Sequence, residues 1–513
     1  MPADATVYYT TDGSEPTITN GTVYTGQEIE LNFTTVVRAK AFPVNPMYHA
    51  SQTTTTTYFI NAYHEVPVVS VVVDPDLLWN EEYGMLADGP NIDKSKPPFK
   101  NSTFRKVKDA SNPYEGYMEY YDLDGTQVFS QGIAISTAGD FSLDQPQKSF
   151  KVRAKSEYGA KTFAAALFED RPYTEYKSLV LRNCGNDGMS ARIRDGFVSR
   201  LMDAYGSTVI HQAWKPVAMY INGVYWGHMN LRERVDRYFI AQFEGIPLEE
   251  ADNMDILLGS GTSSRYVEWG SNKAYKAMLE KLEKSDPANN PADRAYLDEN
   301  IDVDNLLEYM AFEMFVGNSD IGNTRFYRLH GNDPETGKPY KWKWILYDVD
   351  WAFWQASFNS PWSFTKKTGM GDKNINNTCF MTVLKVPEYK ELFLKKLGDL
   401  FKTFTPEYLS NILDECVAEL HPDTEMRLHF ARWAEYHDRN LRAEWPTKEG
   451  AAYTYWENHV NRMYNTFQKR PYLFWAMVKE AFKLTDAQME SYFGPRPEKP
   501  DVEWSAGDKK WFD

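Results

Sequence analysis

The chain has 513 residues, of which 42% are hydrophobic and 15% aromatic, a composition that excludes a wholly disordered protein and allows roughly three domains of about 150 residues each. Its 56 basic and 72 acidic residues give a net charge of −16, so nucleic acid is a poor candidate partner. The longest apolar run, residues 66–73, is far shorter than the ~18 residues that a membrane-spanning helix needs. Three widely spaced cysteines are too few for a disulfide framework or a Cys-rich zinc module.

Residues 1–62 are predicted to be all-β. Hydrophobic and basic residues alternate through 37–41, and a Thr-rich stretch over 53–57 closes the segment, a pattern typical of a small sandwich. The run YYTTDGSEPT, the strand VRAKAF and the Thr-rich strand resemble the C-terminal domain of chitobiases and hexosaminidases. That resemblance implies an immunoglobulin-like β-sandwich that serves as an accessory module without chemistry of its own.

The larger domain is expected to begin after a linker at 61–65. The apolar run 66–73 predicts a buried strand, and alternation through 115–155 predicts a twisted antiparallel sheet. The dipeptide Asn222-Gly223 between two strand-like runs predicts a hairpin of strands 216–221 and 224–232.

Helical periodicity appears first over 190–205, where apolar residues recur at four-residue spacing. Ser190 is a candidate N-cap and Gly206 stands just past the predicted end. From about residue 270 the helical pattern dominates, and the predicted helices cover 274–283, 303–316, 382–401 and much of 405–482.

These patterns predict an α+β protein. A β-rich part at 66–235 and a helix-rich part at 236–490 suggest a single domain of two lobes with a cleft between them. Residues 491–513 are rich in Pro and Gly and are expected to form a tail.

The segment 303–351 offers the most informative chemistry. A helix that ends near Gly317 leads into a loop with Asp320 and Asn323, and strands at 324–330 and 341–350 follow. Asp348 and Asp350 stand at the second strand's end, where residues i and i+2 of an extended chain point to one side and can share a hard cation. Asn323 could complete that shell, and Asp320 could accept a proton from a substrate hydroxyl.

Protein kinases use the same order of helix, acidic loop, hairpin and metal-binding carboxylate. The spacing here differs, because two residues rather than four separate Asp320 from Asn323. The chain also has no Asp-Phe-Gly triplet, and the Gly/Ser-rich stretch 259–264 lacks the Lys-Ser/Thr ending of a P-loop, so it is interpreted as a loop.

Five blocks in order resemble the CotH family, named for spore coat protein H. They are QKSF at 147–150, LRN at 181–183 with an Arg-Asp pair downstream, YINGVYWG at 220–227 leading to LRER, the Asn-x-Asp pattern at 318–323, and DVDW at 348–351. The similarity spans about 66–480. It implies an atypical, secreted or cell-surface protein kinase of bacterial origin that binds ATP with magnesium and phosphorylates Ser or Thr hydroxyls of a protein substrate.

The resemblance also implies roles for residues. In the nucleotide site, Lys148 would contact phosphate, Glu233 would orient that lysine or a metal, and Arg194 would contact phosphate as well. If the strand register is shifted, three cations on the opposite strand face could replace the lysine: Lys151, Arg153 and Lys155.

In the catalytic site, Asp320 corresponds to the catalytic Asp and Asn323 to its companion. Asp348 and Asp350 correspond to the carboxylates that hold magnesium against the β- and γ-phosphates.

Two other classes of function stay open. The N-terminal module and Trp-rich segments at 342–354 and 433–456 are compatible with a non-catalytic surface protein that binds glycans or cell-envelope partners. Glycoside hydrolysis by two carboxylates is a third reading, for which the sequence offers no compelling pair. Zinc hydrolysis is disfavoured because the nine histidines form no His-Glu-x-x-His motif.

Overall fold

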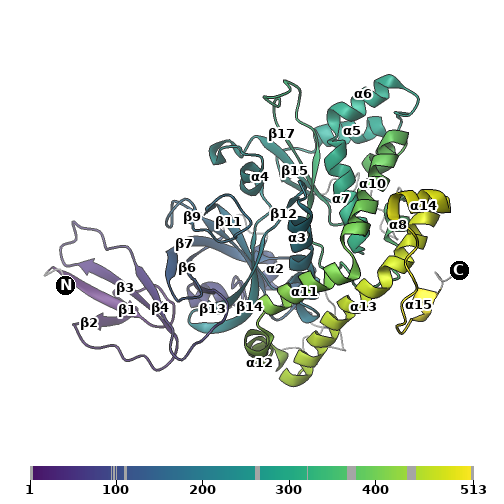
Figure 1. Ribbon diagram of the computed structural model, residues 1–513. Helices are drawn as coiled ribbons and strands as arrows, with labels where there is room; N and C mark the ends of the chain where they lie inside the picture. Colours follow the sequence, from purple (N-terminus) through teal and green to yellow (C-terminus); the bar gives the residue numbers. More distant parts are fainter. Residues whose placement is uncertain are drawn as a thin grey trace. The chain divides into compact units, whose positions relative to one another are not determined.

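The computed structural model describes residues 4–93, 95, 99, 101–108, 113–259, 266–320, 322–366, 377–435 and 446–509 (Figure 1). The chain forms two compact units, each built from three segments. The first unit comprises Met1–Met189, Trp214–Arg234 and Val417–Trp456, and the second comprises Ser190–Ala213, Val235–Cys416 and Glu457–Asp513. Both units mix helices with sheets, in agreement with the expected α+β class.

The first unit opens with an antiparallel sheet whose strand order is β2-β1-β3-β4. Its strands are β1 (Ala5–Thr10), β2 (Thr22–Tyr24), β3 (Thr35–Pro43) and β4 (Thr54–Tyr58). The predicted alternating and Thr-rich strands are therefore confirmed as β3 and β4. The strands described in this segment form one sheet.

A second sheet of the first unit closes on itself in the order β11-β14-β13-β5-β6-β7-β8. Its strands are β5 (Val68–Val72), β6 (Tyr114–Tyr121), β7 (Gln127–Ala138), β8 (Ser149–Ala154), β11 (Ser178–Arg182), β13 (Trp214–Ile221) and β14 (Val224–Glu233). The strand expected within 66–73 is confirmed as β5, which pairs in parallel with β13 and antiparallel with β6. Its residues from Val69 on are buried, as a continuous apolar run predicts.

The predicted hairpin is confirmed as β13 and β14. Ile221 pairs with Val224, so Asn222 and Gly223 are the two turn residues. Both have positive φ, 49° and 78°. A two-residue turn needs this left-handed backbone to match the strand twist, and Asn-Gly is the pair that adopts it most readily.

The remaining elements of the first unit are short: α1 (Pro75–Trp79), α2 (Thr103–Lys108), η1 (Phe141–Asp144), β9 (Phe163–Ala164), β10 (Glu175–Tyr176), η2 (Gly185–Met189), η4 (Pro422–Met426) and α12 (Arg427–Trp433).

The second unit has a sheet of order β12-β18-β17-β15-β16, in which only the β12–β18 pair is parallel. Its strands are β12 (Ile210–His211), β15 (Met254–Leu258), β16 (Tyr266–Trp269), β17 (Arg325–Leu329) and β18 (Lys343–Leu346). Buried apolar side chains of β12, β15, β17 and β18 pack with Phe239 and Ile240 of α4 into one core cluster. Beyond Gly259, the Gly/Ser-rich stretch 259–264 lies outside the described residues.

Helices make up the rest of the second unit (Figure 1). They are α3 (Arg194–Tyr205), α4 (Arg237–Phe243), η3 (Leu248–Glu250), α5 (Lys273–Leu282), α6 (Pro291–Asn300), α7 (Val303–Val316), α8 (Ser360–Phe364), α9 (Thr378–Val383), α10 (Pro387–Thr403), α14 (Asp486–Phe493) and α15 (Ala506–Lys509), together with most of α11 (Pro406–Glu419) and of α13 (Glu449–Phe482). The helices predicted from 274, 303 and 382 onward are confirmed as α5, α7 and α10, although α10 starts later than expected.

Helix α3 also begins later than its periodicity predicts. Its N-cap is Ile193, which makes no side-chain cap bond, so the expected cap at Ser190 is wrong. The reason is that Arg192 has a φ of 60°, a left-handed conformation that an α-helix cannot include. The predicted end is confirmed, because Gly206 adopts the left-handed C-cap with a φ of 71°.

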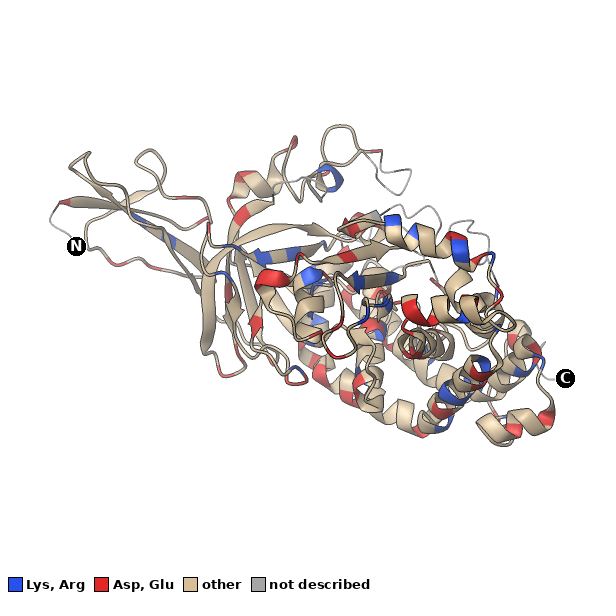
Figure 2. Ribbon diagram, turned by 90° about the horizontal axis from the view of Figure 1, so that it is seen from above, with Lys and Arg blue, Asp and Glu red and all other residues tan. Residues whose placement is uncertain are grey.

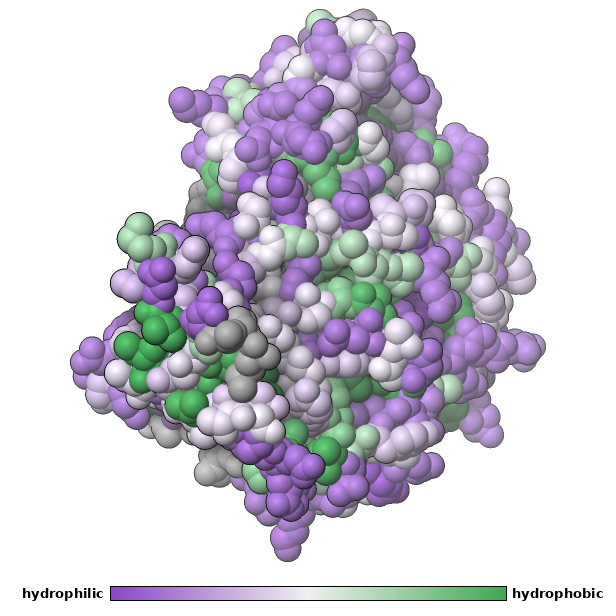
Figure 3. Space-filling model, turned by 90° about the vertical axis from the view of Figure 1, so that its left-hand side faces the viewer, coloured by the Kyte–Doolittle hydropathy of each residue, from purple (hydrophilic) through white to green (hydrophobic). Residues whose placement is uncertain are grey.

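The C-terminal residues pack on the second unit. Trp504 stands edge-to-face to Tyr472 of α13 at 6.0 Å and packs against the cluster of Ala356, Leu473 and Met477. Acidic and basic residues are interspersed along the helices (Figure 2), and hydrophilic residues predominate on the face that Figure 3 shows. Among the residues described, no helix has both the length and the hydropathy needed to cross a membrane.

Candidate active site

Helix α7 positions the acidic loop. Its residues from Asn305 to Val316 are all buried. The Asn305 side chain holds the helix against β18, because it donates to the Trp344 carbonyl at 3.2 Å and accepts from the Trp344 amide at 2.6 Å. The helix ends at Gly317, whose φ of 64° turns the chain into the loop that carries Asp320.

The Asn323 amide joins the loop to the segment after β18. Its Nδ2 donates to Asp320 Oδ2 and to Asp348 Oδ2, each at 2.9 Å. Three of the residues singled out from the sequence therefore meet at one point. The two carboxylate oxygens lie no more than twice 2.9 Å apart, with the amide nitrogen between them.

The geometry expected for Asp348 and Asp350 does not apply. Strand β18 ends at Leu346, and Asp348 has a φ of 58°, so the chain is not extended where the two aspartates stand. Asp348 is half-buried, whereas Asp350 is 1% exposed. The predicted extended backbone at Asp348 and Asp350 is wrong because the ladder between β17 and β18 stops at Ile345, before the acidic pair.

Glu313 is a further acid of the site and is not among the residues predicted from the sequence. It lies on α7 and is 2% exposed, and its Oε2 is among the buried atoms without a hydrogen-bond partner in the described part of the chain. Burial raises its pKa to about 8; hydrogen bonds from Asn318 and Tyr309 oppose that shift, and the charges of Asp320 and Asp348 add to it. The available signal was an acidic residue among the apolar residues of the last two turns of α7, four residues before Gly317.

The donor set fits magnesium bound together with phosphates. No cluster of three or more His, Cys, Asp or Glu side chains suited to a metal occurs among the described residues. Magnesium, however, usually takes one or two carboxylates and completes its octahedron with water and substrate phosphates. Asp348 and the side-chain oxygen of Asn323, whose amide nitrogen donates to Asp348 Oδ2, offer such hard oxygen ligands.

Arg194 packs against aromatic residues of the segment that follows Asp350. It is the first residue of α3, it is fully buried, and its guanidinium carbon is 4.4 Å from the Trp354 ring centroid. Trp354 in turn contacts Trp351 at 4.8 Å and His459 at 5.5 Å between ring centroids. The phosphate contact expected for Arg194 stays a prediction.

The two nucleotide-site candidates of the first unit are both buried. Lys148 is 3% exposed, and its ammonium group donates to the Leu143 and Gln145 carbonyls at 2.5 and 2.6 Å. It also lies 4.1 Å from the Phe104 ring centroid. In the strand that follows, β8, the residues in register with Lys148 are buried: Phe150, Val152 and Ala154. Lys151 and Arg153 alternate with them and are half-buried, as the predicted register requires. The register therefore gives no reason to replace Lys148 with one of those cations as the candidate phosphate contact.

Glu233 ends β14 and is 2% exposed. It forms an ion pair with Arg171, whose Nε is 2.9 Å from Oε2, and it accepts a hydrogen bond from the Tyr173 hydroxyl. Burial and the Glu233 charge raise the pKa of Tyr173, so the tyrosine stays a donor. Arg171 lies 62 residues from Glu233 in the chain, so no local sequence pattern predicts this ion pair.

Two protein-family models match the chain. The model of the CotH kinase protein family matches residues 135–473, more than half of the chain. The chain belongs to the CotH kinase protein family. The chitobiase/β-hexosaminidase C-terminal domain matches residues 1–55. No curated protein matches the chain.

Both resemblances inferred from the sequence are thus confirmed, in the expected order along the chain. The CotH match contains every candidate site residue, from Lys148 in the first unit to Asp350 in the second. A kinase-like protein is what membership of this family indicates.

Proposed function

We propose that this CotH-family protein is an atypical, ATP- and magnesium-dependent kinase that phosphorylates a Ser or Thr hydroxyl of a protein outside the cell or at its surface. The observation that carries the proposal is the Asn323 amide that brings the Asp320 and Asp348 carboxylates together beside a buried glutamate. Membership of a kinase family supports it independently. We further propose that the N-terminal segment is an immunoglobulin-like accessory module of an exported protein; its match to the chitobiase/β-hexosaminidase C-terminal domain supports the accessory role.

In this mechanism Asp320 takes the proton of the acceptor hydroxyl as its oxygen bonds to the γ-phosphorus. The bond between the γ-phosphorus and the bridging oxygen breaks, and ADP leaves with the electron pair. Asn323 holds Asp320 in place through its amide nitrogen. Bound magnesium would neutralise the phosphate charge, with Asp348, Asp350 and the Asn323 side chain as its protein ligands.

Lys148, Glu233 and Arg194 are the proposed nucleotide-binding residues. Lys148 and Arg194 would contact phosphate oxygens, and Glu233 would orient the lysine. Lys148 donates to two main-chain carbonyls, so a phosphate contact would require its ammonium group to exchange at least one of them.

The same geometry disfavours glycoside hydrolysis. A glycosidase places two carboxyl groups on either side of the bond that it cleaves. Here the nitrogen of the Asn323 amide occupies the space between Asp320 and Asp348, which leaves no room for a sugar between them.

The proposal is tested by titration calorimetry of the whole chain with Mg-ATP. Asp348→Asn is the sharpest variant, because asparagine tolerates the left-handed backbone at this position and only the charge is removed. We expect the wild type to bind and Asp348→Asn to bind at least about tenfold more weakly, the cost of one lost charge-assisted ligand. Asp399→Ala, at an exposed position on α10, is the control and should bind like the wild type.

Failure of the wild type to bind Mg-ATP, or equal binding by Asp348→Asn, would refute the kinase proposal. Glycan-array binding that survives Asp348→Asn would then support the non-catalytic surface protein instead.

A further inference from the structure

Arg470 is a buried cation whose donors bind four main-chain carbonyls and one hydroxyl around the candidate site. It lies on α13 and is 4% exposed. A guanidinium has five N–H donors, and all five are used here. Nε donates to the Phe315 carbonyl at 2.9 Å, Nη1 to the Ala356 and Phe358 carbonyls at 3.3 and 3.2 Å, and Nη2 to the Met314 carbonyl at 3.0 Å and to Ser360 Oγ at 2.8 Å.

These acceptors lie on both sides of the acidic site in the sequence. Met314 and Phe315 form the last turn of α7, directly before the loop that carries Asp320. Ala356, Phe358 and Ser360 follow the segment that carries Asp348 and Asp350 and lead into α8. One side chain therefore ties the chain entering the loop to the chain leaving the acidic pair.

The contact with the turn is close. A Cβ on Gly317 would lie 2.7 Å from Arg470 Nη2 and 2.9 Å from Cζ. Glycine at this position is required twice, by the left-handed φ of 64° and by the guanidinium packed against it. The turn into the loop and the arginine are thus shaped to each other.

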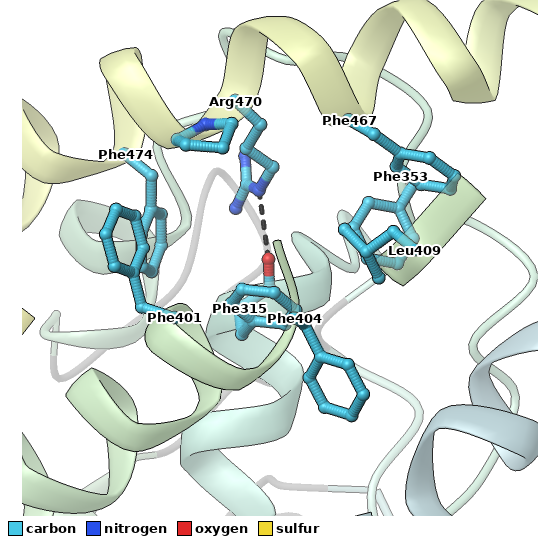
Figure 4. A pocket seen from close by; sticks show the side chains of 9 residues that line it. Phe315, Phe353, Phe401, Phe404, Leu409, Phe467, Arg470 and Phe474 are labelled. Atoms are coloured by element: carbon cyan, nitrogen blue, oxygen red, sulfur yellow. Dashed lines mark hydrogen bonds between the residues drawn. The ribbon is translucent and has the colours of Figure 1, made fainter. Parts of the chain in front are cut away.

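The surroundings make these bonds strong. Arg470 lines a cavity of about 20 Å³, roughly the room of one water molecule. The other lining residues are apolar: Phe315, Phe353, Phe401, Phe404, Leu409, Phe467, Pro471 and Phe474 (Figure 4). Figure 4 shows the guanidinium directed at the Phe315 carbonyl. In such a water-poor environment a hydrogen bond is electrostatically stronger than at the surface.

The arrangement is costly as a purely stabilising device. In the described part of the chain no carboxylate contacts Arg470. Burial lowers its pKa to about 9, which leaves it charged at neutral pH. The negative end of the α7 dipole compensates part of the desolvation cost. Apolar side chains of similar volume often stabilise a core as well as or better than a buried charge, so a role in specifying geometry is the better explanation.

We propose that Arg470 is a positioning residue of the phosphoryl-transfer site, which sets the placement of the Asp320 loop relative to the Asp348–Asp350 segment. The proposal rests on the proposed kinase function for its catalytic consequence, but its structural part stands by itself. Arg470 acts through Gly317, the end of α7 and the start of α8, and it touches neither acid directly.

The test compares Arg470→Lys with Arg462→Lys, an exposed arginine on the same helix. Lysine keeps the charge but offers three donors from a single atom, so it cannot span the five acceptors. We expect Arg470→Lys to lower kcat for phosphate transfer by about 100-fold, the typical effect of a misplacement of about 1 Å, while KM for Mg-ATP changes less than about threefold. Arg462→Lys should match the wild type. An unchanged kcat in a folded Arg470→Lys protein would overturn the proposal.

Hydrogen exchange measured by mass spectrometry on the same proteins separates the two proposals. We expect Arg470→Lys to speed exchange at residues 317–323 and 353–360 at least about tenfold, with α5 and α10 unchanged. That result would support the positioning role even if the protein proves not to bind ATP. Unchanged exchange in both segments would refute the role even in an active kinase.

A second variant covers the case in which Arg470→Lys does not fold. Gly317→Ala leaves the arginine in place but pushes a methyl group into its guanidinium. It should speed exchange in the same two segments. Gly245→Ala, at a glycine with a φ of 66° and open space around it, controls for backbone strain alone and should not.

Discussion

Burial of the Glu313 side chain sets its protonation state. Its pKa of about 8 means that the folded protein holds a proton at neutral pH that the unfolded chain, with a pKa near 4.5, has released. The contribution of this proton to the free energy of unfolding is therefore complete below pH 4.5. It decreases as the pH rises and is lost above pH 8. The slope reaches at most about 1.4 kcal/mol per pH unit between these limits.

Glu313→Gln should remove this dependence, because glutamine is neutral at every pH and has the same shape. We expect the Tm of the variant relative to the wild type to rise steadily from pH 5 to pH 8, measured by scanning calorimetry in the presence of a chelator. Glu391→Gln, on the exposed face of α10, should show no such trend. A Tm difference for Glu313→Gln that is constant across this range would contradict the raised pKa.

The residues of the candidate site differ in how far the sequence could predict them. Asp320, Asn323 and Asp348 were predicted as a group from their motif, and they do meet. Glu313 and Arg470 were not predicted, because helical periodicity marks only which positions face the core. Whether a charged side chain is buried there depends on the partners that surround it.

At the scale of an element, the β13–β14 hairpin depends on its turn residues. Asn222 has a left-handed φ, and its side chain accepts from the Val73 amide at 2.9 Å and donates to the Val73 carbonyl at 2.7 Å. The turn thus also binds the end of β5, which is a neighbour of β13 in the closed sheet.

Replacing this residue separates the two contributions. Asn222→Ala should lower the free energy of unfolding by about 2–3 kcal/mol, through about 1 kcal/mol of left-handed strain and the loss of two hydrogen bonds. Asn222→Gly loses the hydrogen bonds, but glycine adopts the left-handed backbone without strain. Its free energy of unfolding should therefore fall less than that of Asn222→Ala. Urea unfolding followed by tyrosine and tryptophan fluorescence measures both. Equal losses for alanine and glycine would mean that the backbone conformation carries no cost.

Other elements depended on contacts that local patterns do not contain. Helix α3 was predicted with its correct end but began at Arg194 rather than near Ser190, because Arg192 is left-handed. The strand predicted over 341–350 ends at Leu346, where its pairing with β17 stops. In both cases hydrophobic periodicity continued beyond the point at which the backbone turned.

At the scale of the whole molecule, neither unit is continuous in sequence. The second unit draws its core from residues 235–416, but Ile210 of β12 also belongs to that core, and Phe467 and Arg470 of α13 cover the end of α7. Removing the flanking segments would expose the edge of β18 and the aromatic cavity.

A fragment of residues 235–416 should therefore not fold cooperatively. We expect weak near-ultraviolet circular dichroism, dye binding to exposed apolar surface and no sharp thermal transition, whereas the full chain should melt cooperatively. A sharp transition of the isolated fragment would show that its own contacts suffice.

The class of fold, the main helices, the hairpin turn and both families could be predicted from the sequence. These features depend on periodicity, turn chemistry and motifs, all of which involve residues within a few positions of one another. Tertiary structure alone decided which acids meet, that Glu313 holds a proton, and that Arg470 braces a helix end 155 residues away. Burial and long-range hydrogen bonds belong to pairs of distant segments, and no local pattern encodes them.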